Sequence, residues 1–320
     1  MRAYAIRRFL LILPTLIILT LILFFMFRIV PGSMLDLMVQ QHEISTTSER
    51  PIDRQALEHM LGLDVPIHVQ YGRWILGFLQ GDFGKSLWSE RTLAEELRNR
   101  LPITIELSIL SMVLGLLFSI PIGLYAAIRQ DTIGDYIGRT WSILALAVPS
   151  FWVATMVFIY PSIWWDWIPP IEYIPLVEDP LGNLGQFLIP AVIMGAFTSG
   201  GTMRITRTMM LEVMRQDYIR TAWAKGLRER VVVLRHAVKN TLIPVITIVG
   251  GMIPGLLGGS VIMEQIFCLP GMGRYLLEAV RMRDYTVVSG WNLLMSTFVM
   301  IVIVVTDLAY AYVDPRIRYK

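Results

Sequence analysis

The sequence predicts an all-α, polytopic membrane protein with six transmembrane helices. Three observations support this fold class. First, 55% of the 320 residues are hydrophobic and only 17% are charged, whereas soluble domains carry about 25% charged residues. Second, the apolar residues gather in stretches close to the ~20 residues that a helix needs to cross a bilayer. Third, the basic residues concentrate in alternate connecting segments, as expected for a chain that crosses repeatedly. Disorder is excluded by the apolar content and a disulfide scaffold by the single cysteine, Cys268.

The first apolar stretch follows three arginines, Arg2, Arg7 and Arg8, and could be read as a secretory signal. It is too long for the apolar part of such a signal and no small-residue cleavage site follows it, so we expect it to be retained as a span. The fourth stretch is short, and a serine and two glycines near its end interrupt the apolar run, so the sequence does not define its last residue sharply. The six predicted spans are residues 9–30, 101–128, 140–160, 187–203, 241–263 and 287–310.

The distribution of basic residues predicts the orientation. Six spans put both termini on one side of the membrane, and the segments on that side hold 17 of the 28 basic residues. The segments on the other side are longer in total but hold only 10. Because cytoplasmic loops carry the excess of Lys and Arg, we expect a cell (plasma or inner) membrane protein with both termini cytoplasmic. Topology then accounts for the net charge of +3, and no nucleic-acid partner is expected.

The spans divide the chain into four parts. These are the N-terminal tail and first helix (1–30), an extracytoplasmic helical insertion (31–100), a five-helix core (101–312) and a cytoplasmic tail (313–320). The insertion is expected to hold a short helix at 51–61 and, ahead of the second span, a capping box formed by Thr92 and Glu95. It also holds an apolar stripe at helical spacing, which lies either at the membrane interface or against neighbouring protein: Ile67, Tyr71, Trp74, Ile75 and Phe78. In the segment after the third span, four aromatic residues predict an interfacial belt: Trp164, Trp165, Trp167 and Tyr173.

The cytoplasmic segment 204–240 is the most informative part of the chain. Its 37 residues hold nine basic and three acidic side chains. One helical face is predicted to be apolar; its members are Met210, Val213, Met214, Tyr218 and Ala222. Gly226 then interrupts the pattern, and 227–240 is expected to form a second helical stretch. Positive-inside bias explains the sign of the charge, but the apolar face and the glycine indicate a surface on which another protein docks.

Within this segment, DYIRTAWAKGL (217–227) and RHAVKNTLIPV (235–245) resemble the cytoplasmic loop of ATP-binding-cassette (ABC) importer permeases, of the dipeptide, oligopeptide and nickel family. The resemblance covers nearly the whole chain. In the broader importer family the loop begins with Glu-Ala-Ala, where this chain has Arg220, Thr221 and Ala222, a departure that the peptide branch shares. Further matching blocks in the expected order are 62–86, 101–109, 259–274, 283–290 and 314–319.

The resemblance implies the type I ABC importer permease architecture and a function. The chain would form half of a translocation pathway for peptides or similar small solutes, together with a second permease subunit as a heterodimer. Two ATPase subunits would bind the ATP, an extracytoplasmic solute-binding protein would deliver the cargo, and the lipid bilayer would surround the spans; the chain would have no cofactor of its own.

The resemblance also assigns a coupling segment that docks in a groove of an ATPase subunit. Gly226 would let the backbone turn, Arg220 and Lys225 would pair with acidic groups, and Ala222 and Ala224 would keep the contact tight. The implied coupling residues are Asp217, Arg220, Thr221, Ala222, Ala224, Lys225, Gly226 and Leu227.

No catalytic or metal site is predicted, so the chain is not expected to be an enzyme. Its four histidines have no ligand-spaced partner on the same side of the membrane. The stretch 79–86 ends like a phosphate-binding loop, but Leu79 stands where that pattern needs its first glycine.

Two acidic residues fall within the predicted spans, Glu106 and Asp307. Ionisable groups in a span mark a pathway or relay, although Glu106 could equally bond a neighbouring helix. These acids leave open a proton-coupled secondary transporter, and a non-transporting membrane scaffold is the other alternative. Gly251, Gly255 and Gly259 form a row that suits either a pore-side or dimer face or ordinary packing within the bundle.

Overall fold

The computed structural model describes residues 2–29, 64–86, 88–89, 91–170 and 172–313. The predicted helix at 51–61, much of the insertion and the tail after Val313 lie outside the described residues. The chain divides into two compact units, the first made of Met1–Ala5, Arg100–Arg274 and Val299–Lys320, and the second of Ile6–Asn99 and Tyr275–Phe298.

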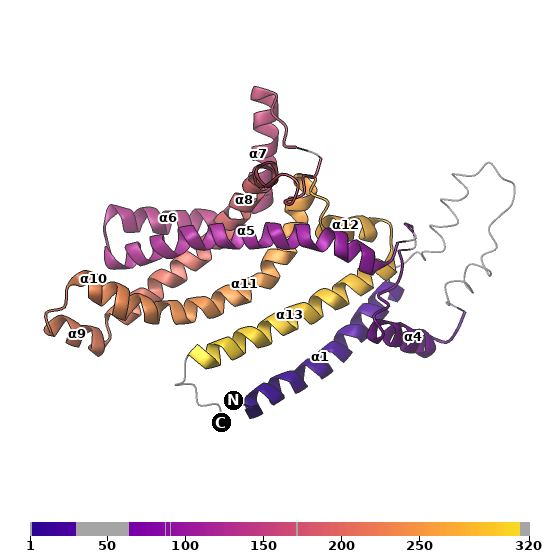
Figure 1. Cartoon of the computed structure of the whole chain (residues 1–320), viewed down its shortest axis with the longest axis horizontal. Coiled ribbons are helices and arrows are strands. Elements are labelled where there is room, and N and C mark those ends of the chain that lie inside the picture. The colour runs from indigo at the N-terminus through magenta and orange to yellow at the C-terminus, as the bar shows by residue number, and fades with distance from the viewer. Residues whose placement is uncertain (1, 30–63, 87, 90, 171, 314–320) are drawn as a thin grey trace. The chain divides into compact units, whose positions relative to one another are not determined.

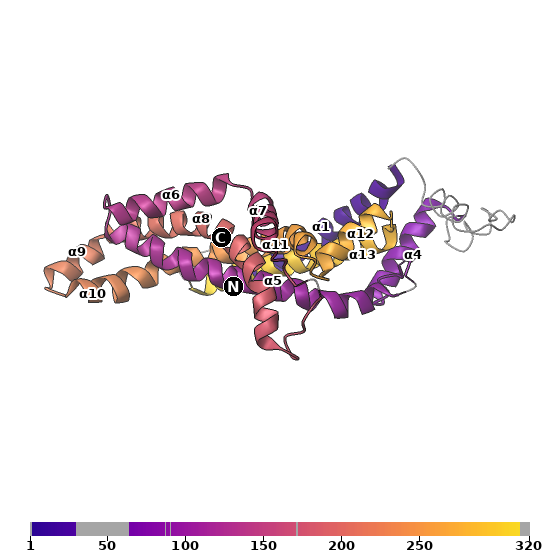
Figure 2. The same ribbon diagram turned by 90° about the horizontal axis from the view of Figure 1, so that it is seen from above.

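The first unit is a bundle in which α8 packs against both α6 and α11. Figures 1 and 2 show these helices running side by side. Its apolar core joins α5, α7, α8 and α11 around buried residues such as Leu107, Phe187, Ala191 and Met263. The helices are α5 (Leu93–Ile128), α6 (Ile133–Ala147), α7 (Ser150–Trp165), α8 (Pro180–Met214), α9 (Asp217–Ala224), α10 (Glu229–Val231), the π-helix η1 (Val232–Val238) and α11 (Lys239–Ile266).

The predicted third span, 140–160, is wrong as a single helix. The chain turns by 89° between α6 and α7. Proline at 149 explains the break, because a residue before proline is pushed out of the helical region. Val148 accordingly has extended backbone angles, φ −89° and ψ 121°.

The helices that contain or flank residues 204–240 are longer than predicted. α8 continues to Met214, so 204–214 extends the fourth span as a helix. After Gly226, α10, η1 and α11 follow without a break from Glu229 to Ile266. The second helical stretch predicted at 227–240 is therefore confirmed from Glu229 onward, and it continues directly into the fifth span.

The second unit contains α4 (Ile67–Leu79) and most of α1 (Arg2–Ile29), and it shares α12 (Met272–Arg281) and α13 (Tyr285–Val313) with the first unit. The hydroxyls of Tyr71 and Thr20 lie 2.8 Å apart, and the rings of Tyr71 and Phe24 have centroids 5.2 Å apart. Part of the apolar stripe of α4 thus packs on neighbouring protein, although Ile67 stays exposed.

The predicted capping box at the start of α5 is confirmed. The backbone N–H of Thr92 donates to the Glu95 carboxylate at 3.0 Å, and the N–H of Glu95 donates to the Thr92 hydroxyl at 3.3 Å. These bonds satisfy donors that a helix start otherwise leaves without partners.

The all-α class is confirmed, since the regular structure of the described residues is helical apart from an isolated bridge between Lys85 and Thr92. The count of six spans is not confirmed. By length and composition, the described residues offer four crossing helices, or five if α6 and α7 form one bent span. The four are Leu93–Ile128, Pro180–Met214, Ile248–Ile266 and Tyr285–Thr306, and α1 contributes a shorter apolar stretch, Ile12–Met26.

Candidate functional site

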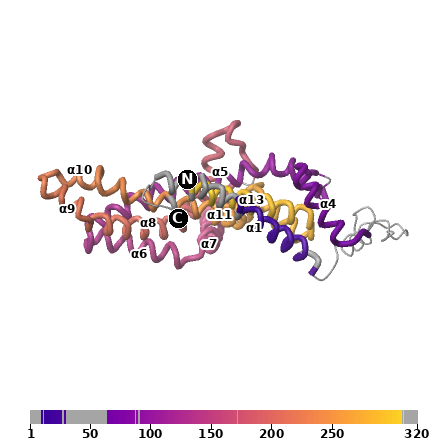
Figure 3. The backbone as a smooth tube through the Cα atoms, turned by 90° about the horizontal axis from the view of Figure 1, so that it is seen from below, coloured from indigo at the N-terminus to yellow at the C-terminus, as the bar shows by residue number. Residues whose placement is uncertain are grey.

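The coupling segment, residues 217–227, consists of α9 and the turn that follows it. It lies where α8 ends and α10 begins, as Figures 1 and 3 show. The chain leaves α8 at Arg215, and Gln216 has extended angles of φ −72° and ψ 148°. A new helix then starts at Asp217.

The inner face of α9 is fixed to the rest of the first unit. Ile219 is fully buried and Ala222 nearly so. Both belong to a cluster with buried residues of α5, α8 and η1, namely Ala127, Met210, Val232, Val233 and Ala237. A displacement of α9 is therefore transmitted by direct packing to the ends of these helices.

Two expectations need correction here. The predicted apolar face does not lie on one helix, because α8 ends at Met214 and α9 begins at Asp217. Four of its five residues still pack in one cluster (Met210, Val213, Met214 and Ala222), whereas Tyr218 is exposed. Ala222 is covered by its own chain, so it supports α9 from within and is not available to tighten a contact with a partner.

The outer face of α9 is polar and accessible. Arg220 and Asp217 form an ion pair at 3.6 Å, with side chains 75% and 97% exposed, so water can replace either partner at little cost. Thr221 donates to the carbonyl of Asp217 at 2.9 Å, and Ala224 and Lys225 are exposed.

Two aromatic residues are also exposed on α9, Tyr218 at 43% and Trp223 at 41%; Tyr218 was predicted on the apolar face, whereas Trp223 was not among the predicted residues. Tyr and Trp are enriched among the residues that dominate protein interfaces. Their occurrence in a short basic segment was the signal that could have identified them.

The turn after α9 depends on Gly226. Its φ of +74° lies in the left-handed region. The N–H of Gly226 donates to the carbonyl of Trp223 at 2.9 Å, and that of Leu227 to the carbonyl of Ala222 at 3.4 Å. This is the paired bonding of a Schellman motif, in which glycine is favoured. A Cβ at Gly226 would meet no atom within 4 Å, so the glycine is required for its backbone angle rather than for space, and the predicted turn is confirmed.

A bidentate ion pair joins α6 to α8. Arg207 donates to the two carboxylate oxygens of Asp135 at 2.7 and 2.8 Å. The Asp135 side chain is fully buried, and it also accepts the backbone N–H of Asp131 at 3.1 Å. The sequence reading counted Arg207 only as one of nine basic residues, since nothing in the sequence indicates which carboxylate it meets.

A second buried carboxylate, Glu264, lies at the end of α11. It accepts the Thr104 hydroxyl at 2.7 Å and the backbone N–H of Arg274 at 2.9 Å. The Thr104 oxygen in turn accepts the N–H of Met272 at 2.9 Å. A Cβ at Gly271 would collide with this carboxylate, so the absence of a side chain there leaves the space that the carboxylate occupies. A Cβ at Gly273 would collide with Val261 and lie 3.0 Å from the carboxylate. The sequence reading passed over Glu264 because it directly follows the predicted fifth span.

Glu106 is half-buried within α5, and the Asn183 side chain of α8 lies beside it. Asn183 also donates to the carbonyl of Ile174 at 2.9 Å. Nearby, burial raises the pKa of the Tyr173 hydroxyl, and the Glu106 and Glu178 carboxylates raise it further, so the phenol stays neutral. Glu106 therefore faces a neighbouring helix, and its part in a pathway stays a prediction. The side chain of Asp307 is not among the described side chains.

The glycine row of α11 does not serve close packing within the described chain. A Cβ at Gly251 or Gly255 would meet no described atom within 4 Å, and one at Gly259 would reach only Met194, at 3.8 Å. Ordinary packing within this chain's own bundle therefore does not account for the first two positions.

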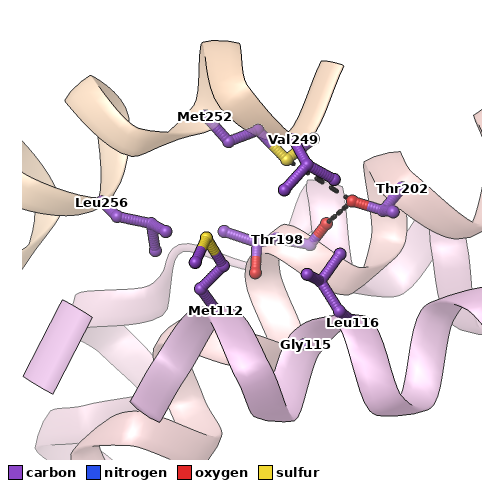
Figure 4. Close-up of a pocket in the computed structure, with 8 residues that line it drawn as sticks. All are labelled: Met112, Gly115, Leu116, Thr198, Thr202, Val249, Met252 and Leu256. Carbon is purple, nitrogen blue, oxygen red and sulfur yellow. Dashed lines mark hydrogen bonds between the residues drawn. The ribbon is translucent and has the colours of Figure 1, made fainter. Parts of the chain in front are cut away.

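A small cavity lies between α5, α8 and α11 (Figure 4). Its volume is about 10 Å³, which is close to the space of one water molecule. Thr202 donates to the sulfur of Met252 at 3.4 Å across it. The other labelled residues are Met112, Gly115, Leu116, Thr198, Val249 and Leu256. This cavity is far too small for a dipeptide.

The chain matches a family of known proteins over most of its length. The family described as "Binding-protein-dependent transport system inner membrane component" matches residues 119–319. The N-terminal part of the same kind of membrane component matches residues 1–108.

Several curated relatives are similar over the whole chain. A putative peptide transport system permease protein of Brucella abortus (strain 2308) is 36% identical over 319 residues, covering 100% of both chains. An oligopeptide transport system permease protein of Bacillus subtilis (strain 168) is 37% identical over 322 residues, again with 100% of both covered. A dipeptide transport system permease protein of Escherichia coli (strain K12) is 34% identical over 343 residues, with the same coverage.

Among solved structures, one described as the crystal structure of an amino acid ABC transporter with histidines is similar with a TM-score of 0.49 and 11% identity. The similarity covers 70% of this chain and 95% of that chain. At this level it is too weak to support an inference about function.

Proposed function

Because this chain belongs to the family of binding-protein-dependent transport system inner membrane components, it is a membrane-spanning permease subunit of an ABC importer, and we propose that its cargo is a peptide. The support is that relatives of 34–37% identity over their full length are named for peptide, oligopeptide and dipeptide transport. Transport driven by a proton relay and a scaffold without transport are both disfavoured by this membership.

The peptide pathway is proposed to lie between this chain and a second permease subunit. Beside α11, where the uncovered glycines lie, the described bundle leaves only about 10 Å³ between α5, α8 and α11, whereas small-molecule sites measure about 300–1,000 Å³; the cavity of about 520 Å³ between α6 and α8 does not involve α11. The uncovered positions Gly251 and Gly255 on α11 suit a close approach by another helix. The proposed assembly is completed by two ATPase subunits and an extracytoplasmic solute-binding protein.

The coupling segment is proposed to dock on an ATPase subunit. The observation that carries this proposal is the division of α9 into a buried inner face, Ile219 and Ala222, and an accessible outer face with Arg220 and Trp223. A partner that grips the outer face would move α9 as a rigid piece, and the inner face would pass the movement to α8 and η1. ATP-driven closure would then switch the bundle between two packed states.

ATP is proposed to bind only to the partner subunits. Residues 79–86 resemble a phosphate-binding loop, but their serine is already hydrogen-bonded within its own unit. The Ser86 hydroxyl donates to the buried Asp284 carboxylate at 2.7 Å. A carboxylate beside this serine would repel a triphosphate, because like charges held close together are destabilising.

The orientation is proposed from charge, with both termini and the coupling segment in the cytoplasm. The basic excess of the alternate segments supports it. The exposed rings of Trp164 and Trp165 at the end of α7 suit the opposite interface, where tryptophan is enriched.

The coupling role can be tested by replacing Gly226 in the full importer, reconstituted in liposomes with ATP and a labelled dipeptide. Gly226→Val should reduce uptake at least tenfold, because a β-branched residue is strained at φ +74°. Gly226→Asn is the matched control, since asparagine tolerates the left-handed region, and it should retain most of the uptake.

Both variants should insert normally, because a side chain at this position meets no atom. Equal and normal uptake by the two variants would refute the coupling role of this turn. If wild-type vesicles hydrolyse ATP but import no peptide, the cargo assignment fails while the coupling proposal stands.

A further inference from the structure

A second cavity of the first unit lies between α6 and α8, whereas the site of Figure 4 lies between α5, α8 and α11. Its volume is about 520 Å³. One end is lined by Arg139, Arg204 and Arg207, and the other includes Ile143, Leu146 and Ala147. No acidic residue lines it, so it is basic at one end and apolar at the other.

The two ends are separated along the helix axis. Arg139 and Ala147 are eight residues apart on α6, which corresponds to about 12 Å at 1.5 Å per residue. α6 begins at Ile133, directly after the short connection from α5. If α5 and the bent pair α6–α7 cross the membrane, the basic end would lie toward the membrane surface and the apolar end toward the bilayer centre. Ile143 and Leu146 are exposed, and the cavity is therefore accessible from the side of the helix pair.

The arginines at the basic end differ in how far they are engaged. Arg207 is held by both oxygens of Asp135. Arg139 is only 3.8 Å from Asp135 and lies over the Tyr136 ring. Arg204 is exposed, and no acidic side chain pairs with it in the described part of the chain. The Asp135 carboxylate thus bonds Arg207 and lies near Arg139, Asp131 also acts on Arg207, and Arg204 is left without an acidic partner among the described residues.

Only the arginine side chains of this cavity have hydrogen-bond donors available for a ligand, because both hydroxyl groups already donate to backbone carbonyls. The Ser142 hydroxyl donates to the carbonyl of Gly200 at 2.6 Å, and the Thr208 hydroxyl to that of Arg204 at 3.0 Å. Guanidinium groups present several N–H donors in a planar fork that matches phosphate oxygens. The chemistry of this end therefore favours a phosphate over a carbonyl-rich or cationic ligand.

We propose that the cavity between α6 and α8 is a binding site for an anionic phospholipid. The lipid phosphate would lie between Arg139 and Arg204, and the ion pair of Arg207 with Asp135 would form the base of the cavity. One acyl chain would run along Ile143, Leu146 and Ala147. Basic pockets between transmembrane helices near the cytoplasmic surface suit such headgroups. The proposal rests on membership of a membrane family and not on the peptide cargo.

The test is native mass spectrometry of the purified full chain in detergent, with phosphatidylglycerol or phosphatidylcholine added. Wild type should retain phosphatidylglycerol in preference. Arg139→Gln with Arg204→Gln should weaken its retention by about tenfold or more, since hydrogen bonds to charged groups are lost. Arg129→Gln removes an exposed arginine outside the cavity and is the matched control, with retention unchanged.

A second variant tests the apolar end. Ala147→Trp fills the cavity without altering charge, and it should also reduce retention of phosphatidylglycerol. Circular dichroism checks that each variant keeps its helices, and a misfolded variant is replaced by Leu146→Trp, which tests the same wall.

Three results would overturn the proposal. Equal retention of phosphatidylglycerol and phosphatidylcholine would show that the arginines do not distinguish between the two headgroups. Full displacement of the lipid by millimolar inorganic phosphate would mean a free-anion site. The lipid could also be lost when the second permease is added, while Arg139→Gln with Arg204→Gln prevents the two permeases from assembling. That result would show that this face is a contact between permeases.

Discussion

Glu264 is expected to hold the end of α11 against α5 and the start of α12, and this can be measured. Glu264→Ala removes the acceptor of the buried Thr104 hydroxyl and of the half-buried Arg274 N–H. A buried donor left without a partner costs about 1–3 kcal/mol, and one that water can reach costs less, so the expected loss is about 2–4 kcal/mol. Some additional loss comes from the cavity that the removed side chain leaves.

Glu264→Gln should cost less, about 1 kcal/mol. Its amide oxygen can face the Arg274 N–H, and its NH₂ can donate to the Thr104 oxygen, which leaves only the threonine proton without its acceptor. Thr104→Val removes the oxygen that accepts the Met272 N–H and should cost about 2–4 kcal/mol, whereas Thr104→Ser keeps the hydroxyl.

The assay is equilibrium unfolding of the full chain in mixed micelles, combined with hydrogen exchange at the amides of Met272 and Arg274. Exchange at these two amides should speed up in Glu264→Ala and Thr104→Val. Glu178→Gln, an exposed carboxylate outside the network, should change the stability by less than about 0.5 kcal/mol.

A double-mutant cycle decides whether the two residues act together. Residues in one hydrogen-bond network show coupling of about 0.5–3 kcal/mol. Strict additivity of Glu264→Ala and Thr104→Val, with unchanged exchange at Met272, would refute the network.

Three further outcomes follow from other contacts. Arg207→Ala leaves the Asp135 carboxylate buried without its ion pair and should cost about 3–5 kcal/mol in the same unfolding assay; Arg207→Ala together with Asp135→Ala should recover part of this loss, and no recovery would contradict the pairing. Thr92→Ala removes the cap of α5 and should cost about 1 kcal/mol, with faster hydrogen exchange confined to the first turn; protection as in wild type would contradict it. Ile219→Ala should cost about 2–5 kcal/mol and release α9, as judged by exchange at residues 217–227, whereas Trp223→Ala on the outer face should leave that exchange unchanged.

Sequence patterns were sufficient for features that depend on neighbours along the chain. The capping box of Thr92 and Glu95 and the interruption of the helix at Gly226 were both predicted correctly, and the structure adds that Gly226 turns in the left-handed region. Each is decided within a few residues, by a side chain that bonds a nearby N–H or by the absence of a Cβ.

Periodicity failed where a local break changes the direction of a helix. The third span was predicted as one helix across Pro149, and the apolar face of the coupling segment was extended across Gln216. In both places apolar residues continue at helical spacing beyond the break, so hydrophobicity alone cannot reveal the turn.

The sequence by itself determined that this chain crosses a membrane, which family it resembles, and where a coupling segment should lie, because apolar content, charge bias and short motifs are written in consecutive residues. Only the tertiary structure decided that Ala222 faces inward, that Arg207 meets Asp135 and that Glu264 bonds Thr104. The last two pairs are 72 and 160 residues apart. Contacts at such separations arise when helices pack, and one sequence does not specify which of several carboxylates a given arginine or hydroxyl will meet.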